Sequence, residues 1–189
     1  AFEPLPPQQL ARLKRAIERI KKDYEGKAVM SVYVRGLSNG GAVTFNEIDE
    51  VYDAASLMKL PIYIALMKQI ELKPEIEQLK LKVYEGGVYE QNIVEDKLTQ
   101  PGEELTIHEL IQRSIINSDN RAIQTLLNYI GVYAFNDVLR DHGLPEANIM
   151  DKTIYKVTPQ EYSAFFRVLY NATYLKPESS EKILEMLTR

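Results

Sequence analysis

The N-terminal part of the chain shows two hydrophobic periods in succession. As far as Gly26 the apolar positions recur every three or four residues with Arg and Lys between them; they are Leu10, Leu13, Ile17, Ile20 and Tyr24. That spacing predicts an amphipathic helix that ends at the glycine. From Ala28 to Arg35 the period is two, and a turn over 39–41 leads to a second short run over 42–46. We therefore predict a helix lying on an antiparallel β-hairpin.

The remainder of the chain carries helical patterns separated by clear breaks. The run from Leu60 to Ile70 is almost wholly apolar, which predicts a buried helix. Pro74 interrupts the pattern, after which we predict a short charged helix over 75–84 and a long loop over 85–102. Further helices are predicted over 107–116, 121–130, 133–141, 159–170 and 177–187. Capping boxes at Thr106 and Thr158 open two of them.

The composition limits the class of protein that the chain can be. Its 189 residues, 45% of them apolar, are enough for one compact domain with room for two lobes. The formal charge of −4 gives no basic surface for nucleic acid, and the absence of cysteine excludes disulfides and thiolate metal sites. His108 and His142 lack the spacing of metal ligands and are interpreted as surface or capping residues. We expect no cofactor, no metal and no transmembrane segment, and we recognise no signal peptide.

Ser56 and Lys59 stand three positions apart at the start of the apolar run. In an α-helix or a 3₁₀ turn these positions project from the same side, so the hydroxyl and the ammonium can meet. A lysine whose pKa is lowered by burial can activate a serine, and a helix N-terminus offers unpaired N–H groups to an oxyanion. The motif alone is weak. Ser179 and Lys182 have the same spacing in a helix that we interpret as opened by a capping serine, and Ser56 has the same alternative interpretation.

A second motif, Ser118-Asp119-Asn120, lies between two predicted helices. By itself it is interpreted as an N-cap cluster. Together with Ser56-x-x-Lys59 it makes the chain resemble the penicillin-recognising serine hydrolases, most closely the class A β-lactamases and their β-lactamase-like relatives. The resemblance extends over residues 102–127 and includes the order of helix, hairpin, Ser-x-x-Lys helix and all-helical stretch.

The resemblance implies an α+β protein with the β-lactamase/transpeptidase-like fold. In that fold an all-helical lobe accompanies an antiparallel sheet lobe, which is represented here by the N-terminal helix and hairpin. We accordingly expect three parts: residues 1–54 from the α/β lobe, residues 55–176 as the helical lobe with both motifs, and residues 177–189 as a last helix returning to the α/β lobe, with the remainder of the family fold absent.

The resemblance also implies roles for four residues. Ser56 would be acylated by a β-lactam or an acyl-D-Ala-D-Ala-like amide, with its own backbone N–H as an oxyanion donor. Lys59 would be the base or proton shuttle, and Ser118 would pass the proton to the leaving nitrogen. Asn120 would bind the substrate amide and also bond Lys59, whereas Asp119 is mainly structural in that family. By position, Tyr84 or Tyr89 would line the substrate cleft.

Two departures from the family pattern stand out. The third family motif, Lys-Thr-Gly, is not found, and the sequence stops at Arg189 at the end of a predicted helix. We therefore hypothesise the longer piece of a divided chain, with the missing strands supplied by a second polypeptide. The family's Glu-x-x-Leu-Asn loop, whose glutamate activates the deacylating water, is replaced by Glu146-Ala147-Asn148-Ile149-Met150. Glu146 is interpreted as a solvated loop carboxylate, which leaves hydrolysis of the acyl-enzyme slow.

The resulting expectation is a β-lactamase-like serine hydrolase, incomplete or weakly active as this chain alone. Its partner would be a small-molecule β-lactam or a peptidoglycan peptide, and the family implies an extracytoplasmic location, periplasmic or secreted. Two alternatives stay open: a D,D-peptidase or transpeptidase-like acyl-transferase, and a non-catalytic binding or scaffold relative. The natural substrate and the oligomeric state are left open.

Overall fold

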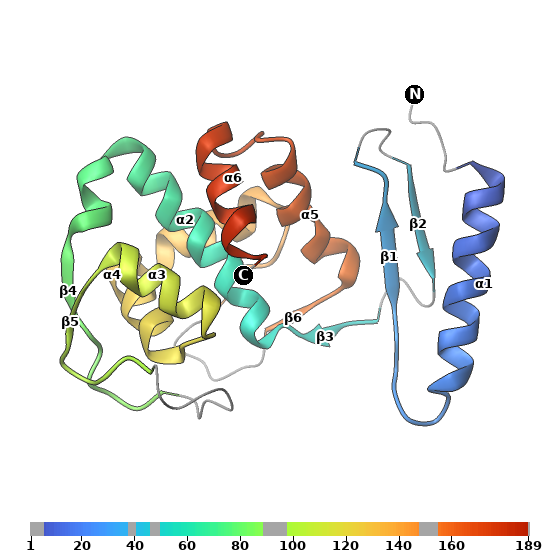
Figure 1. Ribbon diagram of the computed structural model, residues 1–189, viewed down its shortest axis with the longest axis horizontal. Coiled ribbons are helices and arrows are strands. Elements are labelled where there is room, and N and C mark those ends of the chain that lie inside the picture. The colour runs from blue at the N-terminus through green and yellow to red at the C-terminus, as the bar shows by residue number, and fades with distance from the viewer. Residues whose placement is uncertain (1–5, 38–40, 46–49, 89–97, 148–154, 189) are drawn as a thin grey trace. The chain divides into compact units, whose positions relative to one another are not determined.

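The elements follow one another along the chain as Figure 1 shows, in a computed structural model that describes residues 6–37, 41–45, 50–88, 98–147 and 155–188. The chain divides into two units. The first combines Ala1–Asp53 with Lys156–Arg167, and the second combines Ala54–Tyr155 with Val168–Arg189. The three-part division expected from the sequence stays a prediction.

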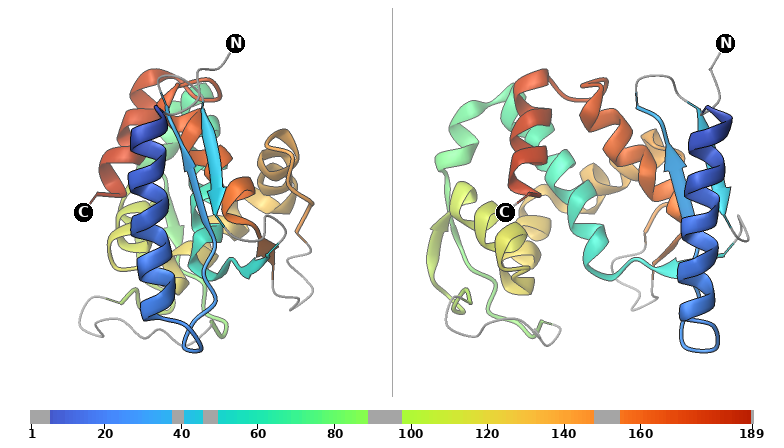
Figure 2. Two further views of the ribbon diagram at one scale, coloured as in Figure 1. Left: turned by 90° about the vertical axis from the view of Figure 1, so that its right-hand side faces the viewer. Right: turned by 45° about the vertical axis from the view of Figure 1, so that its right-hand side comes forward.

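The first unit contains the predicted helix and hairpin. Helix α1 (Pro7–Asp23) begins with proline at a position that needs no N–H and carries two lysines in its last turn. Strand β1 (Val32–Arg35) pairs antiparallel with β2 (Ala42–Phe45), with Val32 opposite Phe45. Helix α1 runs beside this hairpin in both views of Figure 2. The strand is shorter than the period-two pattern because the chain is still turning after the helix, where the Ala28 N–H donates to Tyr24 O. Two residues of the predicted turn, 39 and 40, lie outside the described residues.

A second strand pair in this unit has no counterpart among the predicted elements. Strand β3 (Tyr52–Asp53) pairs antiparallel with β6 (Lys156–Val157). Two-residue strands are too short to carry a hydrophobic period, so the sequence gives no signal for them. Directly after β6, helix α5 (Pro159–Tyr170) opens with the predicted capping box, since the Glu161 N–H donates to Thr158 Oγ1 and the Thr158 N–H donates to a Glu161 carboxylate oxygen.

The second unit is organised around helix α2 (Lys59–Leu72), which follows a 3₁₀ turn, η1 (Ala55–Met58). Helix α2 is apolar on every side, and most of its residues are buried, from Leu60 through Met67. A helix with that pattern belongs inside a protein, and α3, α4 and α6 pack against it. The predicted core helix is confirmed.

The charged helix predicted over 75–84 is wrong. A 3₁₀ helix, η2 (Pro74–Gln78), comes first, and strand β4 (Lys80–Lys82) then pairs antiparallel with β5 (Glu104–Thr106). Pro74 can open a helical turn but cannot continue an earlier helix. In the strand pair, Leu81 lies opposite the buried Leu105 while Lys80 and Lys82 are exposed. Burial against a distant partner therefore outweighs the local preference for helix.

Helices α3 (Ile107–Ile116), α4 (Asn120–Asp141) and α6 (Pro177–Met186) complete the second unit. The predicted capping box at Thr106 is present, with Glu109 as its acidic member. The two helices predicted on either side of Gly131 are the two parts of element α4, which are separated by a kink at Gly131, where the backbone has φ 78° and ψ 158°. Glycine reaches a positive φ at little cost, so the first helical part can end and the second can begin at this residue. No helix in the described part of the chain is long and apolar enough to span a membrane.

Candidate active site

Ser56 lies in the 3₁₀ turn η1, and Lys59 is the first residue of α2. Residues three apart eclipse one another in a 3₁₀ helix, so both side chains project from the same side. Ser56 is exposed, whereas Lys59 is buried, with 8% of its surface accessible. Ala55, directly before the serine, has a φ of 43°, a region that alanine rarely occupies. The predicted nucleophile Ser56 therefore lies at the surface, next to the strained Ala55, and Lys59 is buried beneath the surface.

Ser118 is hydrogen-bonded to both of these residues. It lies on the short connection between α3 and α4 with a φ of 51°. Lys59 Nζ donates to the Ser118 backbone oxygen at 2.5 Å and to Ser118 Oγ at 2.8 Å. The hydroxyl oxygens of Ser56 and Ser118 are 3.5 Å apart, and either hydroxyl can donate. The structure thus brings together three of the predicted site residues, with Ser118 between the other two.

Asp119 has the structural role that an N-cap residue performs. One carboxylate oxygen accepts from the N–H groups of Arg121 and Ala122, at 2.8 and 3.0 Å, and the other accepts from the Thr99 N–H at 2.7 Å. The residue is 1% exposed. The three bonds satisfy the carboxylate, cap α4 and fix the connection that carries Ser118.

Burial lowers the pKa of Lys59 from 10.5 to about 8, although the negative charge of Asp119 acts in the opposite direction. Desolvation penalises the ammonium more than the neutral amine. At this pKa about one molecule in ten carries a neutral Lys59 at pH 7. A neutral amine bonded to the Ser118 hydroxyl can accept a proton, which an exposed lysine at that pH seldom can.

Asn120 is the first residue of α4 and is half-buried. Asn120 directly follows Asp119 and lies in the same turn, two residues after Ser118. The bond from Asn120 to Lys59 that the family resemblance implies stays a prediction. Of the two tyrosines predicted to line the cleft, Tyr89 is outside the described residues. Tyr84 is described and half-buried.

Sequence reasoning missed three residues that hold this region together. They are Thr99, which bonds Asp119, and Arg121 and Thr125 of α4, which bond the chain at residues 84 and 86. Each contact joins positions far apart in the sequence, and each uses a backbone group of one partner. No spacing rule could have indicated them.

Two other sequence interpretations have clear outcomes. Glu146 is solvated as expected: its side chain is 57% exposed and lies 2.9 Å from Arg140. Residues 148–150 of the same loop fall outside the described part. The capping interpretation of Ser179 is wrong, because the N-cap of α6 is Lys176 and Lys182 pairs with Glu77.

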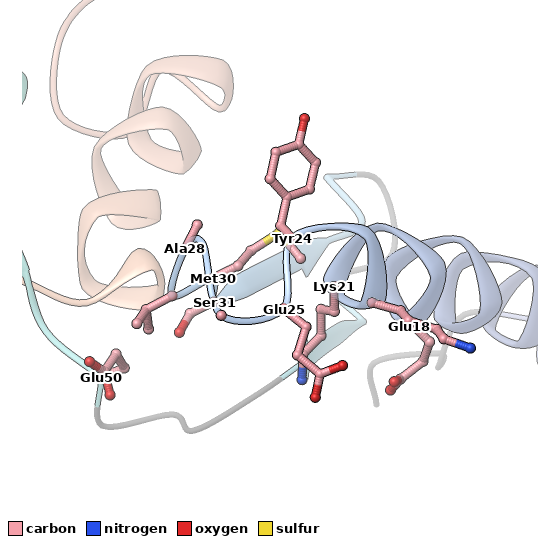
Figure 3. Close-up of a pocket in the computed structure, with 11 residues that line it drawn as sticks. Glu18, Lys21, Tyr24, Glu25, Ala28, Met30, Ser31 and Glu50 are labelled. Atoms are coloured by element: carbon pink, nitrogen blue, oxygen red, sulfur yellow. The ribbon is translucent and has the colours of Figure 1, made fainter.

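A separate cavity of about 620 Å³ lies in the first unit. Its walls come from the end of α1, the segment leading into β1, and Glu50 before β3. Figure 3 shows Glu18 and Lys21 of α1, and Glu25 of the turn that follows the helix, at this cavity. None of the candidate site residues lines it, so it is not part of the Ser56 site.

The fold, together with the linked side chains of Ser56, Lys59 and Ser118, is typical of proteins with the β-lactamase/transpeptidase fold and a Ser-x-x-Lys motif. The model of the beta-lactamase enzyme family matches residues 12–189. The chain belongs to this family.

Solved structures agree on the fold. A β-lactamase from Sphaerobacter thermophilus DSM 20745 superposes with a TM-score of 0.74 at 23% identity, covering 90% of this chain and 66% of its own. The structure of PBP-A gives a TM-score of 0.73 at 19% identity, covering 98% of this chain and 71% of its own. A class A β-lactamase from Mycobacterium abscessus gives 0.72 at 19% identity, covering 92% and 68%.

The chain is shorter than these proteins and spans about two thirds of their length. Among curated proteins, no sequence matches it. At these identities the structural likeness establishes the fold alone, and the predicted α+β fold of the β-lactamase/transpeptidase type is confirmed.

Proposed function

We propose that this chain is a β-lactamase-type serine hydrolase in which Ser56 forms an acyl-enzyme with a β-lactam. The observation that supports the proposal most directly is the Ser118 hydroxyl, which lies 2.8 Å from Lys59 Nζ and 3.5 Å from Ser56 Oγ. A nucleophile, a base and a hydroxyl between them are the parts that acyl transfer to serine requires.

In the proposed acylation, Ser56 Oγ attacks the carbonyl carbon of the amide. The Ser56 proton passes to Ser118, and the Ser118 proton passes to the neutral amine of Lys59. The backbone N–H of Ser56 stabilises the oxyanion of the tetrahedral intermediate. Collapse breaks the C–N bond, and the proton held by Lys59 returns through Ser118 to the leaving nitrogen. One C–O bond has formed, one C–N bond has broken, and Lys59 is neutral again.

Asn120 is proposed to bind the amide of the substrate. Its position at the start of α4, directly after the N-cap residue Asp119, supports this role because the cap holds the turn in one conformation. Asp119 is not assigned a chemical step, since its carboxylate oxygens are already engaged by three backbone N–H groups.

The substrate class is proposed from the structural neighbours. They include β-lactamases and a PBP-A variant solved as an acyl-enzyme complex with penicillin G. A β-lactam or a peptidoglycan peptide would be met outside the cytoplasm, so we propose an extracytoplasmic location. These matches name no second polypeptide, and the proposal is made without one.

A D,D-peptidase or transpeptidase-like acyl-transferase is the second candidate. The Glu146 loop supports it, because that sequence departs from Glu-x-x-Leu-Asn and Glu146 is bonded to Arg140. An acyl-enzyme without an activated water would turn over slowly.

Labelling with a fluorescent penicillin tests the proposal. The chain should become covalently labelled, and Ser56→Ala should remain unlabelled. Loss of the label within seconds favours a β-lactamase, whereas a label that persists for hours favours the acyl-transferase. A chain that takes up no label is the result expected of a binding or scaffold relative.

A further inference from the structure

The turn that carries Ser56 is held by hydrogen bonds before and after the serine. The Leu57 N–H donates to the backbone oxygen of Ala54 at 2.8 Å, which closes residues 54–57 into one turn. We call these four residues the Ser56 turn. The Ala54 N–H donates to the backbone oxygen of Tyr155, also at 2.8 Å, and Ala54 is 1% exposed. Both backbone groups of the residue that begins the Ser56 turn are therefore bonded within the protein.

The second residue of this turn needs such support. Ala55 has a φ of 43°, in the left-handed region that costs free energy for a residue with a Cβ atom. A residue keeps a conformation of this kind only where the surrounding structure holds it there. The bond from Ala54 to Tyr155 fixes the chain directly before the strained residue. It thereby contributes to the position of Ser56 Oγ, 3.5 Å from Ser118 Oγ.

Tyr155 is itself held by its side chain. The half-buried ring ends in a hydroxyl that donates to the backbone oxygen of Pro145 at 2.6 Å. Any residue at position 155 could offer a backbone oxygen to Ala54. The bond to Pro145 requires a donor at the far end of a long side chain, which tyrosine supplies. The identity of residue 155 therefore helps to determine where its backbone oxygen lies.

The segment that receives the tyrosine hydroxyl is anchored to α4. Asn136 of α4 is buried and bonds Ala147 at both backbone groups, because its Nδ2 donates to Ala147 O at 3.1 Å and its Oδ1 accepts from the Ala147 N–H at 2.9 Å. Leu144, directly before Pro145, is also buried, and its N–H donates to Leu139 O of α4 at 2.9 Å. A hydroxyl bonded to Pro145 is thus bonded to a segment that is fixed on both sides.

We propose that Tyr155 is a positioning residue for the nucleophile, because its hydroxyl, bonded to Pro145, holds in place the backbone oxygen that supports the strained Ser56 turn. The inference rests on the proposed function and adds to it a residue that acts through this turn. Without the hydroxyl, Ala55 should relax toward a negative φ and carry Ser56 Oγ away from Ser118. A displacement of about 1 Å between reacting groups can lower a rate about 100-fold. The chemical step should therefore slow while substrate binding is kept.

Three variants isolate this effect. Tyr155→Phe removes the hydroxyl and keeps the ring and the backbone. Tyr174→Phe is the matched control, because Tyr174 is also a half-buried tyrosine of the second unit, and its hydroxyl donates to Asp141 Oδ2 at 2.5 Å, at the end of α4 and not at the Ser56 turn. Ala55→Gly removes the need for support, since glycine adopts a positive φ at little cost.

Acylation by penicillin G, followed by intact mass at increasing concentrations, separates the rate constant at saturation from the concentration that gives half of it. Tyr155→Phe should lower the rate constant roughly tenfold and change the half-saturating concentration by less than about twofold. Tyr174→Phe should match the unmodified chain. Added to Ala55→Gly, Tyr155→Phe should lower the rate constant by no more than about threefold. An unchanged rate constant in Tyr155→Phe, or an equal fall in Tyr174→Phe or in the Ala55→Gly background, would overturn the inference.

Amide hydrogen exchange gives a readout that needs no activity. The Ala54 amide should exchange at least about tenfold faster in Tyr155→Phe and stay protected in Tyr174→Phe. A chain that penicillin G does not acylate contradicts the proposed function, and exchange at Ala54 then decides the positioning role by itself. Unchanged protection of Ala54 in Tyr155→Phe overturns that role.

Discussion

The hydroxyl oxygen of Ser118 lies 2.8 Å from the side-chain nitrogen of Lys59, although one residue precedes α4 and the other opens α2. The backbone oxygen of Ser118 accepts a second bond from the same ammonium. The positive φ of Ser118 is a strained conformation for serine, and the hydrogen bonds of the N-cap residue Asp119 next to it help to maintain that conformation. The lysine is thus bonded to the residue that stands between it and the proposed nucleophile.

We predict that the acylation rate rises with pH through about 8 and is level above it. Only the neutral amine of Lys59 can accept the proton from Ser118, and burial lowers the pKa of Lys59 to about 8. The rate of labelling by penicillin G, measured between pH 6 and 10, checks this. A rate that is constant across this range would exclude Lys59 as the base.

Protein stability should show the same pKa. The folded chain loses the Lys59 proton near pH 8, but the unfolded chain keeps it until about 10.5. Between these values the unfolded state binds more protons, so the free energy of unfolding should increase as the pH rises through this window. Urea unfolding at pH 7.5 and 10 measures the change, and Lys59→Met should remove the Lys59 contribution. If the lysine variant and the unmodified chain have the same pH dependence, the lysine is not perturbed as described.

Replacing Asp119 by asparagine should change both the pH profile and the stability. Its negative charge raises the pKa of Lys59 against the effect of burial, so its loss should move the midpoint of the rate profile to lower pH. An asparagine also offers one acceptor oxygen where the carboxylate offers two, at a cost of about 1–3 kcal/mol. Denaturant unfolding and the pH profile check the two effects. A midpoint that moves upward would contradict the electrostatic account.

Ser118→Gly should abolish most of the acylation without unfolding the protein. Glycine accepts a φ of 51° more readily than serine, so the variant removes the hydroxyl and relieves strain. Loss of a proton relay should lower the acylation rate by at least about 100-fold. Ser163→Ala serves as the control, because its exposed hydroxyl bonds only the nearby Gln160 carbonyl in the described structure. Acylation rates that fall equally in both variants would show that the Ser118 hydroxyl has no specific role in acylation.

The Glu77 carboxylate should support stability at neutral pH and lose this effect in acid. It accepts from His108 Nδ1 at 2.8 Å and pairs with Lys182, which joins η2, α3 and α6. Burial acts to raise the pKa of Glu77, but the hydrogen bonds from Lys182 and His108 lower it overall from 4.5. A depressed carboxyl pKa gives stability that is present above the unfolded value and is lost as the pH falls through the folded one.

Glu77→Gln should therefore cost about 1–2 kcal/mol at pH 7 and reduce the loss of stability below pH 5. Glu85→Gln is the matched control, because Glu85 pairs with Lys82 at 2.6 Å but its side chain is 60% exposed. An exposed pair of this kind contributes little. Urea unfolding of both variants gives the comparison, and equal costs would place the Glu77 contacts among ordinary surface pairs.

Local signals in the sequence predicted much of the fold. The capping boxes at Thr106 and Thr158 each need only four consecutive residues, and both are present. The apolar run of α2 was correctly assigned to the core because a helix without a polar side has no other stable place.

Contacts between distant backbone groups could not be predicted in this way. The sequence of strand β4 is compatible with a helix unless its pairing with β5 is known. Strands β3 and β6 are too short to show the two-residue hydrophobic period of a strand. At the site, the spacing of Ser56 and Lys59 predicted that both side chains project from the same side of a helical turn. The position of Ser118 between these two side chains and the positive φ of Ala55 depend on packing, which the spacing does not indicate. Alanine and serine have no sequence signature for such angles.

The mass of the intact chain after incubation with penicillin G tests the central claim most directly. We predict an increase by the mass of one penicillin G molecule, located by peptide mapping to Ser56. The increase should be absent in Ser56→Ala and unchanged in Ser179→Ala, whose serine has the same spacing to a lysine but is not bonded to Ser118. An unmodified mass, or a label that persists in Ser56→Ala, would contradict the assignment of Ser56 as the nucleophile.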